Sequence, residues 1–270
     1  MLADKYYASS FSGVPGSAEM DQALRIWTDS NTGNLLTEYT KEMSLDSGTV
    51  LEILSAIYYK AMWTEEFQER NTEKAVFHGA SGDTNADMMK KTDIFGVYHA
   101  DNFTSLGLNL NDSGSMYFLL PDEGTDVNSI VSDSDVMKAV RHDGAEENYS
   151  SALVHLSVPK FRVSCKTDLL DAISSFGVTD ALDASLADFS PLTMDKKEIY
   201  LSKAEHAAMI EIDEHGVTGA AYTELALTRG AAVEVDEMDF ILDRPFMFIV
   251  TGADGSVLFS GVVRNIDQGE

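Results

Sequence analysis

The stretch FILDRPFMFIV, residues 240–250, carries the clearest structural signal in the sequence. From Phe246 to Thr251 the chain is almost wholly apolar and rich in aromatic and β-branched residues, which favours a strand. A second apolar run covers residues 257–263, and the intervening Asp254-Gly255 is a turn signal typical of hairpins. Two apolar strands joined as a hairpin are therefore predicted at this end of the chain.

The rest of the sequence predicts a mixture of helices and strands. A helix is expected over residues 17–31, where Met20, Leu24 and Trp27 fall on one face. A strand with one wet face is expected where Ile210 and Ile212 alternate with acidic residues. The other predicted elements are a buried strand over 50–63, a strand over 115–121 that stops at Pro121, a helix over 126–140, a strand over 152–163 and a helix over 167–176. Because no regular βαβ alternation is present, the fold class is predicted to be α+β.

The composition is that of a folded and strongly acidic protein. Of 270 residues, 44% are hydrophobic and 24% are charged, values that argue against disorder and allow one large domain or two modest ones. With 45 acidic and 19 basic side chains, the net charge is −26. Such a charge repels phosphate backbones and anionic lipid, so nucleic-acid and membrane-surface functions are excluded. We interpret it as a soluble, self-repelling surface.

Sequence signals of cross-linking and of export are lacking. Cys165 is the one cysteine, so no internal disulfide is expected. No apolar run approaches the roughly 18 residues needed to span a bilayer. The opening residues MLADKYYASS have no apolar signal-peptide region, so no signal peptide is predicted in this chain.

The sequence contains no recognisable motif for catalysis, metal binding or cofactor binding. Its histidines form neither an H-E-x-x-H pair nor a zinc-spaced cluster with cysteine; they are His78, His99, His142, His155, His206 and His215. A Gly-rich phosphate loop and a G-x-S-x-G elbow are also absent. Asp46-Ser47-Gly48 and Asp112-Ser113-Gly114 resemble a protease nucleophile turn superficially, and we interpret both as ordinary turns. We therefore expect no catalytic residue, no metal and no cofactor.

One segment is unlike an ordinary surface loop. Residues 215–233, HGVTGAAYTELALTRGAAV, are small, weakly polar and free of proline, and a loop of such length is usually functional. One alternating set is small throughout and could face a core if the segment became a strand: Val217, Gly219, Ala221 and Thr223. The other set could face outward: Thr218, Ala220, Tyr222 and Glu224. We interpret the segment as able to be either loop or strand, the alternative being a flexible loop between two strands.

From about residue 5 to residue 266 the chain resembles the serpins, a family of serine protease inhibitors. Phe240–Val250 matches the family's C-terminal signature at every constrained position. Further blocks are similar to family segments in the right order: LSAIYYKAMWTEEF (54–67), SMYFLLPDEG (115–124), VHLSVPKFRV (154–163), LLDAISSFGVTDAL (169–182) and SKAEHAAMIEIDEHG (202–216). The resemblance implies the serpin fold, which is α+β with mainly antiparallel β-sheets A, B and C and surrounding helices. It also implies that residues 202–214 form the strand beside the gap into which the loop inserts.

The resemblance further implies an inhibitor and not an enzyme. A serpin offers a reactive-centre loop, here residues 215–234, to a serine protease, forms a covalent acyl complex and inserts the cut loop into sheet A of its metastable fold. This suicide-substrate mechanism needs a hinge, which corresponds to Glu214, Gly216, Val217, Thr218, Gly219, Ala220, Ala221 and Thr223. The breach and shutter regions correspond to Trp63, Ser55 and His206. The family also implies secretion, to an extracellular or cell-envelope location.

Some positions depart from the family pattern. Ser55 stands where the family has an asparagine that bonds the histidine corresponding to His206, and Val217 follows the hinge glycine where Thr or Ser is usual. Helices and strands that open the family's sequence have no counterpart here. Residues 1–270 are therefore expected to be a single serpin domain that is incomplete at the N-terminus, with a separate N-terminal segment as a partner that completes the fold.

The reactive bond is assigned by the family's spacing from Glu214. Counting forward places it between Gly230 and Ala231, with Arg229–Gly230 as the alternative. A small residue before the cut suits an elastase-like or subtilisin-like protease, whereas Arg229 suits a trypsin-like one. Three alternatives stay open: a non-inhibitory serpin-fold binding protein, an inactive truncated serpin, and a hydrolase, for which no nucleophile and base can be found.

Overall fold

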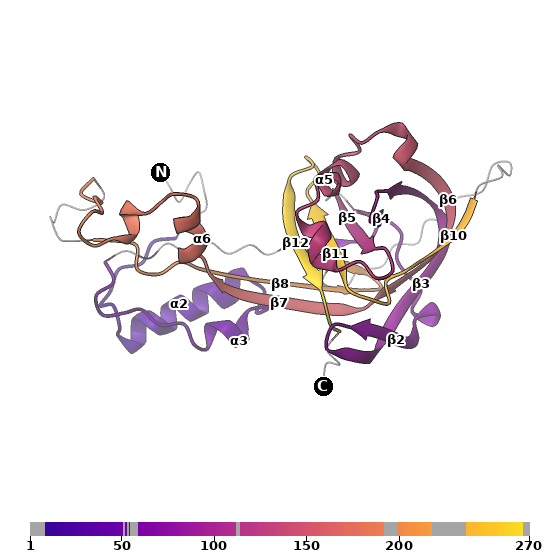
Figure 1. Cartoon of the computed structure of the whole chain (residues 1–270). Coiled ribbons are helices and arrows are strands. Elements are labelled where there is room, and N and C mark those ends of the chain that lie inside the picture. Colours follow the sequence, from indigo (N-terminus) through magenta and orange to yellow (C-terminus); the bar gives the residue numbers. More distant parts are fainter. Residues whose placement is uncertain are drawn as a thin grey trace. The chain divides into compact units, whose positions relative to one another are not determined.

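The computed structural model of the chain describes residues 9–50, 52, 54, 59–111, 114–191, 199–217 and 236–266. The chain divides into two compact units. Unit 1 comprises residues 1–58 and 164–209, and unit 2 comprises residues 59–163 and 210–270. Each unit is described by itself, and the elements carry the labels of Figure 1.

Unit 1 contains short helices, of which α2 (Ala18–Asn31) is the longest in the described part of the chain. It begins where Ser17 Oγ accepts a hydrogen bond from the Met20 amide, and Glu19 and Asp21 in its first turn complement the helix dipole. The others are α3 (Thr37–Thr40), α6 (Leu170–Ser175) and η3 (Asp180–Leu182). The helix predicted over 17–31 is confirmed. The helix predicted over 167–176 is confirmed in shorter form, because residues 161–168 belong to a strand.

Unit 2 contains an eight-stranded sheet, in which β2 pairs with β3 outside the main path β10-β6-β3-β4-β5-β11-β12. Its strands are β2 (Glu73–Gly79), β3 (Gly82–His99), β4 (Phe103–Leu110), β5 (Gly114–Pro121), β6 (Tyr149–Pro159), β10 (Asp236–Ile241), β11 (Phe246–Thr251) and β12 (Val257–Val263). Within the described part of this sheet, neighbours are antiparallel except for the parallel pair β10 and β6. The predicted α+β class with mainly antiparallel sheets is confirmed.

A second sheet has four strands in the order β1-β9-β8-β7. They are β1 (Ala61–Met62), β9 (Gly216–Val217), β8 (Glu205–Asp213) and β7 (Phe161–Asp168). Along β8, Ile210 and Ile212 are buried while Glu211 between them is half-buried. The strand predicted over residues 202–214 is therefore confirmed with slightly shorter bounds.

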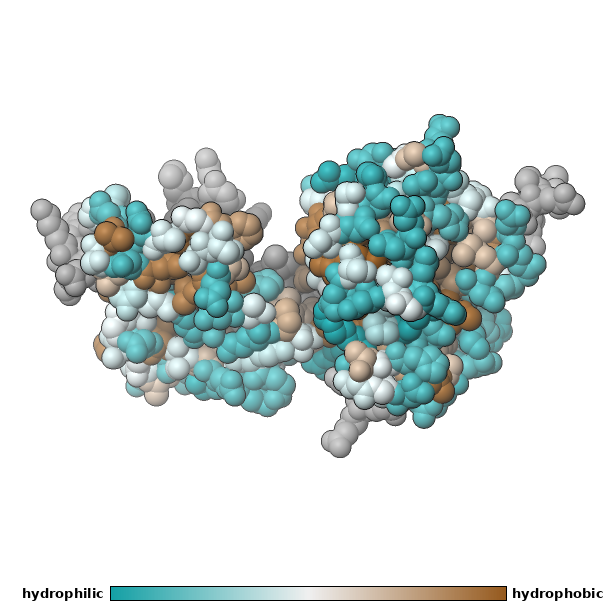
Figure 2. All heavy atoms as spheres, in the orientation of Figure 1, coloured by the Kyte–Doolittle hydropathy of each residue, from teal (hydrophilic) through white to brown (hydrophobic). Residues whose placement is uncertain are grey.

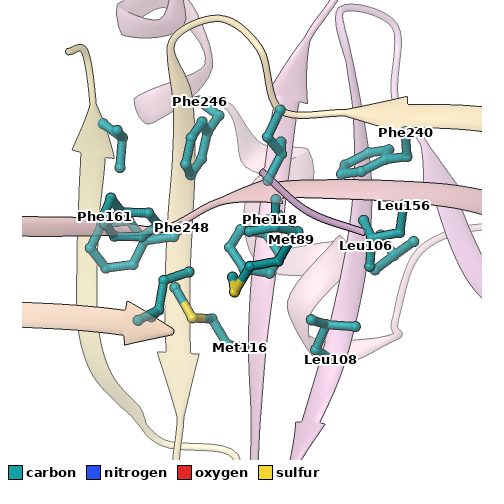
Figure 3. Packing of buried hydrophobic residues seen from close by; sticks show 14 of the residues in the cluster. Met89, Leu106, Leu108, Met116, Phe118, Leu156, Phe161, Phe240, Phe246 and Phe248 are labelled. Carbon is teal, nitrogen blue, oxygen red and sulfur yellow. The ribbon is translucent and has the colours of Figure 1, made fainter. Parts of the chain in front are cut away.

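The C-terminal hairpin forms the centre of the unit 2 core. Strand β11 lies between β5 and β12, so both of its edges are paired, and all six of its residues are buried. Phe246 and Phe248 point into the larger core cluster, where the ring of Phe161 lies 5.6 Å from each of theirs (Figure 3). Met247 and Ile249 point to the opposite face, as the alternation of a strand requires. The predicted hairpin is confirmed at the predicted residues.

Two short helices, α4 (Val127–Val131) and α5 (Ser134–Arg141), cover that opposite face. The single helix predicted over 126–140 is wrong, because the chain breaks between them. Asp133 adopts an extended conformation and its carboxylate accepts a hydrogen bond from the Asp135 amide, which starts a new helix. The pattern of apolar residues continues across the break, which is why periodicity alone missed it.

Two predicted strands differ from the structure. The strand predicted over 50–63 is seen only at β1: Val50 is 56% exposed, and residues 51, 53 and 55–58 lie outside the described residues. The strand predicted over 152–163 is two strands, because the chain passes at Lys160 from the eight-stranded to the four-stranded sheet. There the Lys160 amide donates to the Asp87 carbonyl. Apolar alternation continues through this change of sheet and therefore does not reveal it.

The surface agrees with the acidic composition. Figure 2 shows a face of unit 2 that is covered mainly by hydrophilic side chains. Unit 1 has several large apolar side chains exposed to solvent, among them Phe11, Ile26, Phe176 and Leu186. No helix among the described residues is long and apolar enough to cross a membrane.

Candidate functional site

The described hinge residues lie at the turn between β8 and β9, within unit 2. Strand β9 is antiparallel to β8, with Val217 opposite Ile212. On its other side it pairs with β1, where Val217 lies opposite Ala61 and Gly216 opposite Met62. The two residues of β9 therefore lie between β1 and β8. Val217 is the last described residue before the range 236–266.

Only glycine fits at position 216. Its φ of 151° lies in the region that side chains rarely adopt, and an added Cβ would lie 2.3 Å from the Ala61 carbonyl oxygen. The Asp213 carboxylate accepts hydrogen bonds from the His215 and Gly216 amides at 2.9 Å and 3.1 Å. These two features together bend the chain from β8 back into β9.

Val217 is anchored by burial. It is 1% exposed and belongs to the larger core cluster of unit 2 together with Ala61, Ile210 and Ile212. A β-branched apolar side chain suits this pleated and packed position. The first position of the small alternating set thus faces a core.

Glu214 is a buried carboxylate with two partners. It is 6% exposed, Lys160 Nζ lies 2.9 Å from its Oε2, and Thr72 Oγ1 donates to its Oε1 at 2.7 Å. Its backbone carbonyl accepts the Phe67 amide at 2.9 Å. A buried charge needs such partners, because its desolvation is otherwise costly.

The partners set the charge states of this pair. Burial alone would raise the pKa of Glu214, but the hydrogen bonds from Lys160 and Thr72 outweigh it and hold that pKa below its usual range. Burial would lower the pKa of Lys160, but Glu214 raises it, helped by the charges of Asp213 and Asp87. Both groups are therefore ionised at neutral pH.

Trp63 joins the turn to the segment that follows β1. Its side chain is 1% exposed, and its indole Nε1 donates to the Asp213 carbonyl at 2.9 Å. Its amide donates to the His215 carbonyl, also at 2.9 Å. The ring meets Phe67 edge to face, with centroids 6.2 Å apart. Trp63 therefore fixes the turn from both its backbone and its side chain.

His215 lies between two carboxylates. Its Nδ1 is 3.2 Å from Glu66 Oε2, and its Nε2 is 3.6 Å from Glu69 Oε1. The hydrogen bond with Glu66 raises the pKa of His215, burial opposes this rise, and the charges of Glu66, Asp213 and Glu69 add to it. The imidazole is about one-third exposed, so it exchanges protons with solvent.

The structure brings together Trp63, Glu214, Gly216 and Val217 of the predicted site. His206 lies exposed on β8 in unit 1. The remaining predicted positions lie outside the described residues: Ser55, Thr218, Gly219, Ala220, Ala221, Thr223, Arg229, Gly230 and Ala231. The same holds for residues 112–113, whereas the turn expected at Asp46 is present, with its carboxylate accepting the Gly48 amide at 2.7 Å.

Sequence reasoning missed the partners of the hinge. Lys160, Thr72 and Glu66 lie far from residues 214–215 in the sequence; Thr72 and Glu214, for example, are 142 positions apart. The one available signal was Glu214 itself, because an acidic residue that enters an apolar strand pair needs a cation or a donor. Which residue supplies it was not readable from the sequence.

Within the ranges that the structure describes, no three His, Cys, Asp or Glu side chains are grouped as a metal ion would require. The turn therefore offers hydrogen bonds, ion pairs and a packed side chain. Together these contacts hold β9 between β1 and β8.

Comparisons with known proteins all find members of one family. A family model described as Serpin (serine protease inhibitor) matches residues 2–266. Serpin B11 of Mus musculus is 30% identical over 251 residues, which cover 90% of this chain and 63% of that protein. Serpin-ZX of Arabidopsis thaliana is 30% identical over 281 residues, covering 97% of this chain and 70% of that protein. The chain thus spans 63% of the length of Serpin B11, and the same share of Serpin B10 of Otolemur garnettii.

Solved structures show a similar fold. A thermophilic serpin, tengpin, in the native state has a TM-score of 0.74 at 23% identity, covering 98% of this chain and 67% of its own. Thyroxine-binding globulin in complex with thyroxine has a TM-score of 0.75 at 23% identity, covering 99% and 70%. At these identities the likeness concerns the fold alone.

Proposed function

The chain belongs to the serpin family, and from this premise we propose that it inhibits serine proteases as a suicide substrate. The family is described as one of protease inhibitors, so the chain is not expected to turn over a substrate. The observation that carries the proposal is β9: Gly216 and Val217 pair with both β1 and β8, and Val217 is 1% exposed. Residues from Thr218 onward would extend this strand.

The covalent step proposed here consumes one peptide bond. The serine oxygen of the protease attacks the carbonyl carbon of Gly230, the Gly230–Ala231 bond breaks, and the amine of Ala231 leaves with the proton. An ester between Gly230 and the protease remains. The cut loop then extends β9, with Gly219, Ala221 and Thr223 facing the core as Val217 does.

The driving force comes from the new strand. About ten ladder hydrogen bonds, each contributing about 1 kcal/mol, supply on the order of 10 kcal/mol, to which side-chain burial adds. Dragging the attached protease distorts its oxyanion hole, and the ester is then hydrolysed too slowly to escape. Loop insertion of this kind is a known form of strand addition in serpins.

The proposed targets are elastase-like or subtilisin-like proteases. A small residue before the cut, Gly230, needs a small specificity pocket, and the neighbouring Leu225, Leu227 and Ala231 are aliphatic. A cut after Arg229 would instead fit a trypsin-like protease, whose acidic pocket holds a guanidinium. The proposed site of action is extracellular or in the cell envelope.

Boiling in SDS tests the proposal. The chain is mixed with elastase-like, subtilisin-like and trypsin-like proteases, and a band at the summed mass of the two proteins is expected with the first two. A protease whose nucleophilic serine is replaced by alanine is the control and gives no such band. Mass spectrometry should find a released peptide that starts at Ala231. Cleavage by every protease without a stable complex would contradict inhibition.

A serpin-fold protein that binds a ligand without inhibiting is the second candidate. The observation in its favour is the similar fold of thyroxine-binding globulin, whose structure contains thyroxine. It predicts cleavage without a complex, together with a rise in melting temperature when thyroxine is added. A stable acyl complex with any serine protease would remove this candidate.

A further inference from the structure

The turn that starts the insertion strand carries a titratable contact of its own. Glu214 is held by Lys160 and Thr72, while the next residue, His215, reaches in another direction to Glu66 and Glu69. We propose that protonated His215 is a clasp that holds the β8–β9 turn against the segment after β1, so that the contact between β9 and β1 opens more readily as pH rises. The clasp stands on geometry, and its consequence for inhibition rests on the proposed function.

The position of His215 suits this role. It lies in the turn between β8 and β9, whereas Glu66 and Glu69 belong to the segment that follows β1, the second of them in η1 (Glu69–Asn71). The same two segments are joined by the backbone hydrogen bonds from the Trp63 and Phe67 amides to the His215 and Glu214 carbonyls. Any separation of β1 from β9 at this end must break these contacts together.

The charges around the imidazole favour its cationic form. Glu66 and Glu69 face it from the β1 side, and Asp213 faces it from the end of β8. Lys160 is paired with Glu214 instead. A protonated His215 therefore attracts both carboxylates, whereas a neutral one keeps at most a single hydrogen bond with Glu66.

The direction of the pH effect follows from the raised pKa of His215. A group whose pKa is higher in the folded state contributes its stabilisation fully at low pH and loses it as pH rises through that folded-state pKa. The clasp is thus closed at mildly acidic pH and weakened above neutrality. Because the pair is partly exposed, the effect on opening is about two- to five-fold.

Amide hydrogen exchange measures the opening without any protease. Protection of the Trp63 and Phe67 amides, corrected for intrinsic exchange, is followed from about pH 5.5 to about pH 8.5, the range in which histidine titrates. Protection in the natural sequence should fall about two- to five-fold across this range. In His215→Gln, protection should be independent of pH and equal to that of the natural sequence at high pH. In His215→Lys, which keeps a positive charge, it should be independent of pH and equal to that of the natural sequence at low pH. Glu66→Gln should make this fall in protection with pH, the exchange step, smaller.

A second histidine–carboxylate pair provides the matched control. His155 Nε2 lies 2.7 Å from Glu237 Oε1 on β6 and β10, in the other sheet, so His155→Gln should leave the step at Trp63 and Phe67 unchanged. A titration of the His215 ring by NMR should have its midpoint above the ordinary value of about 6.5. A step that survives in His215→Gln, or its absence from the natural sequence, overturns the clasp.

The rate of complex formation separates the clasp from the proposed function. At each pH the rate of the natural sequence is divided by that of His215→Lys, which cancels the protease's own pH dependence, and the ratio should rise about two- to five-fold with pH. If no protease forms a complex while the exchange step is present, the proposed function fails and the clasp stands. If complexes form but both the ratio and the exchange are flat, the clasp fails alone.

Discussion

A single buried carboxylate, Glu214, controls the geometry at the start of the proposed hinge. Its 6% exposure would be unfavourable for a charge without Lys160 and Thr72. Neighbouring Gly216 cannot carry a side chain, since an added Cβ would meet the Ala61 carbonyl at 2.3 Å. The turn therefore depends on a paired carboxylate at position 214 and on a glycine at position 216.

Glu214→Gln should lower the free energy of unfolding at neutral pH by about 1.5–3 kcal/mol, the range for a hydrogen bond to a charged group. Because the pKa of Glu214 is held below its usual range, this contribution is present above the unfolded-state pKa of about 4.3 and is lost as pH falls through the lower folded-state value. The difference between the two proteins should therefore shrink in acid. Urea unfolding at several pH values measures this difference in stability. Glu237→Gln, which removes a carboxylate from an exposed ion pair with His155, is the control. Equal stability at neutral pH would contradict the assignment.

Val217→Arg should convert the protein from inhibitor to substrate. The side chain at this position is 1% exposed in the core cluster, and an unpaired guanidinium cannot be buried there without a large cost. Because Val217 already anchors β9 between β1 and β8, the arginine disrupts the strand from which insertion continues. Insertion slows, so the protease hydrolyses the ester first. SDS gels should show cleaved protein without complex, while Val217→Thr, which keeps the size and branching of the side chain, should retain the complex. A full yield of complex with the arginine variant means that the insertion register is wrong.

At the scale of elements, β11 organises unit 2, because it is buried on both faces and divides the core into two clusters. Phe248 on one face lies over Gly261 of β12, where an added Cβ would be 2.7 Å from its ring. Ile249 on the other face packs in the cluster that α4 and α5 cover. The hairpin therefore links both layers of the unit.

Phe248→Ala should cost about 3–5 kcal/mol of folding free energy, because it removes a buried ring and leaves a cavity. Val257→Ala, in the same hairpin but 44% exposed, should cost less than about 1 kcal/mol. Denaturant unfolding of both variants, followed by tryptophan fluorescence, makes the comparison. Similar costs for the two substitutions would show that β11 is not the core strand of unit 2.

At the scale of the whole molecule, the net charge of −26 is the main electrostatic influence on stability. Ion pairs at the surface, such as Lys90–Glu73 and Lys138–Asp135, cannot balance this charge, since the chain has 45 acidic side chains and only 19 basic ones. Self-repulsion of this size destabilises a compact state.

Salt should therefore stabilise the protein. The urea midpoint is expected to rise steadily between about 0.05 M and about 1 M NaCl, as the screening length falls from more than 10 Å to about 3 Å. Sucrose, which strengthens burial without screening charge, is the control and separates the two effects. A midpoint that falls with NaCl would show that attractive ion pairs outweigh the repulsion.

Much of the fold was readable from local sequence. The hairpin at residues 246–263, helix α2 and strand β8 were predicted because apolar periodicity and an Asp-Gly turn act over a few neighbouring residues. The family followed from ordered blocks of sequence. The single helix predicted over 126–140 was wrong, because apolar content does not show where a chain bends. Of the strand predicted over 50–63, the described residues show only β1.

The sequence by itself determined the α+β class, the acidic surface, the family and the positions Trp63, Glu214, Gly216 and Val217 as candidates. Tertiary structure alone decided that Lys160 and Thr72 hold Glu214, that Glu66 and Glu69 surround His215, and that β9 already pairs with β1 and β8. The physical reason is distance along the chain. The ion pairs of Glu214 and His215 and the pairing of β9 with β1 join residues far apart in the sequence, which leave no local pattern and meet only once folding has brought the segments together.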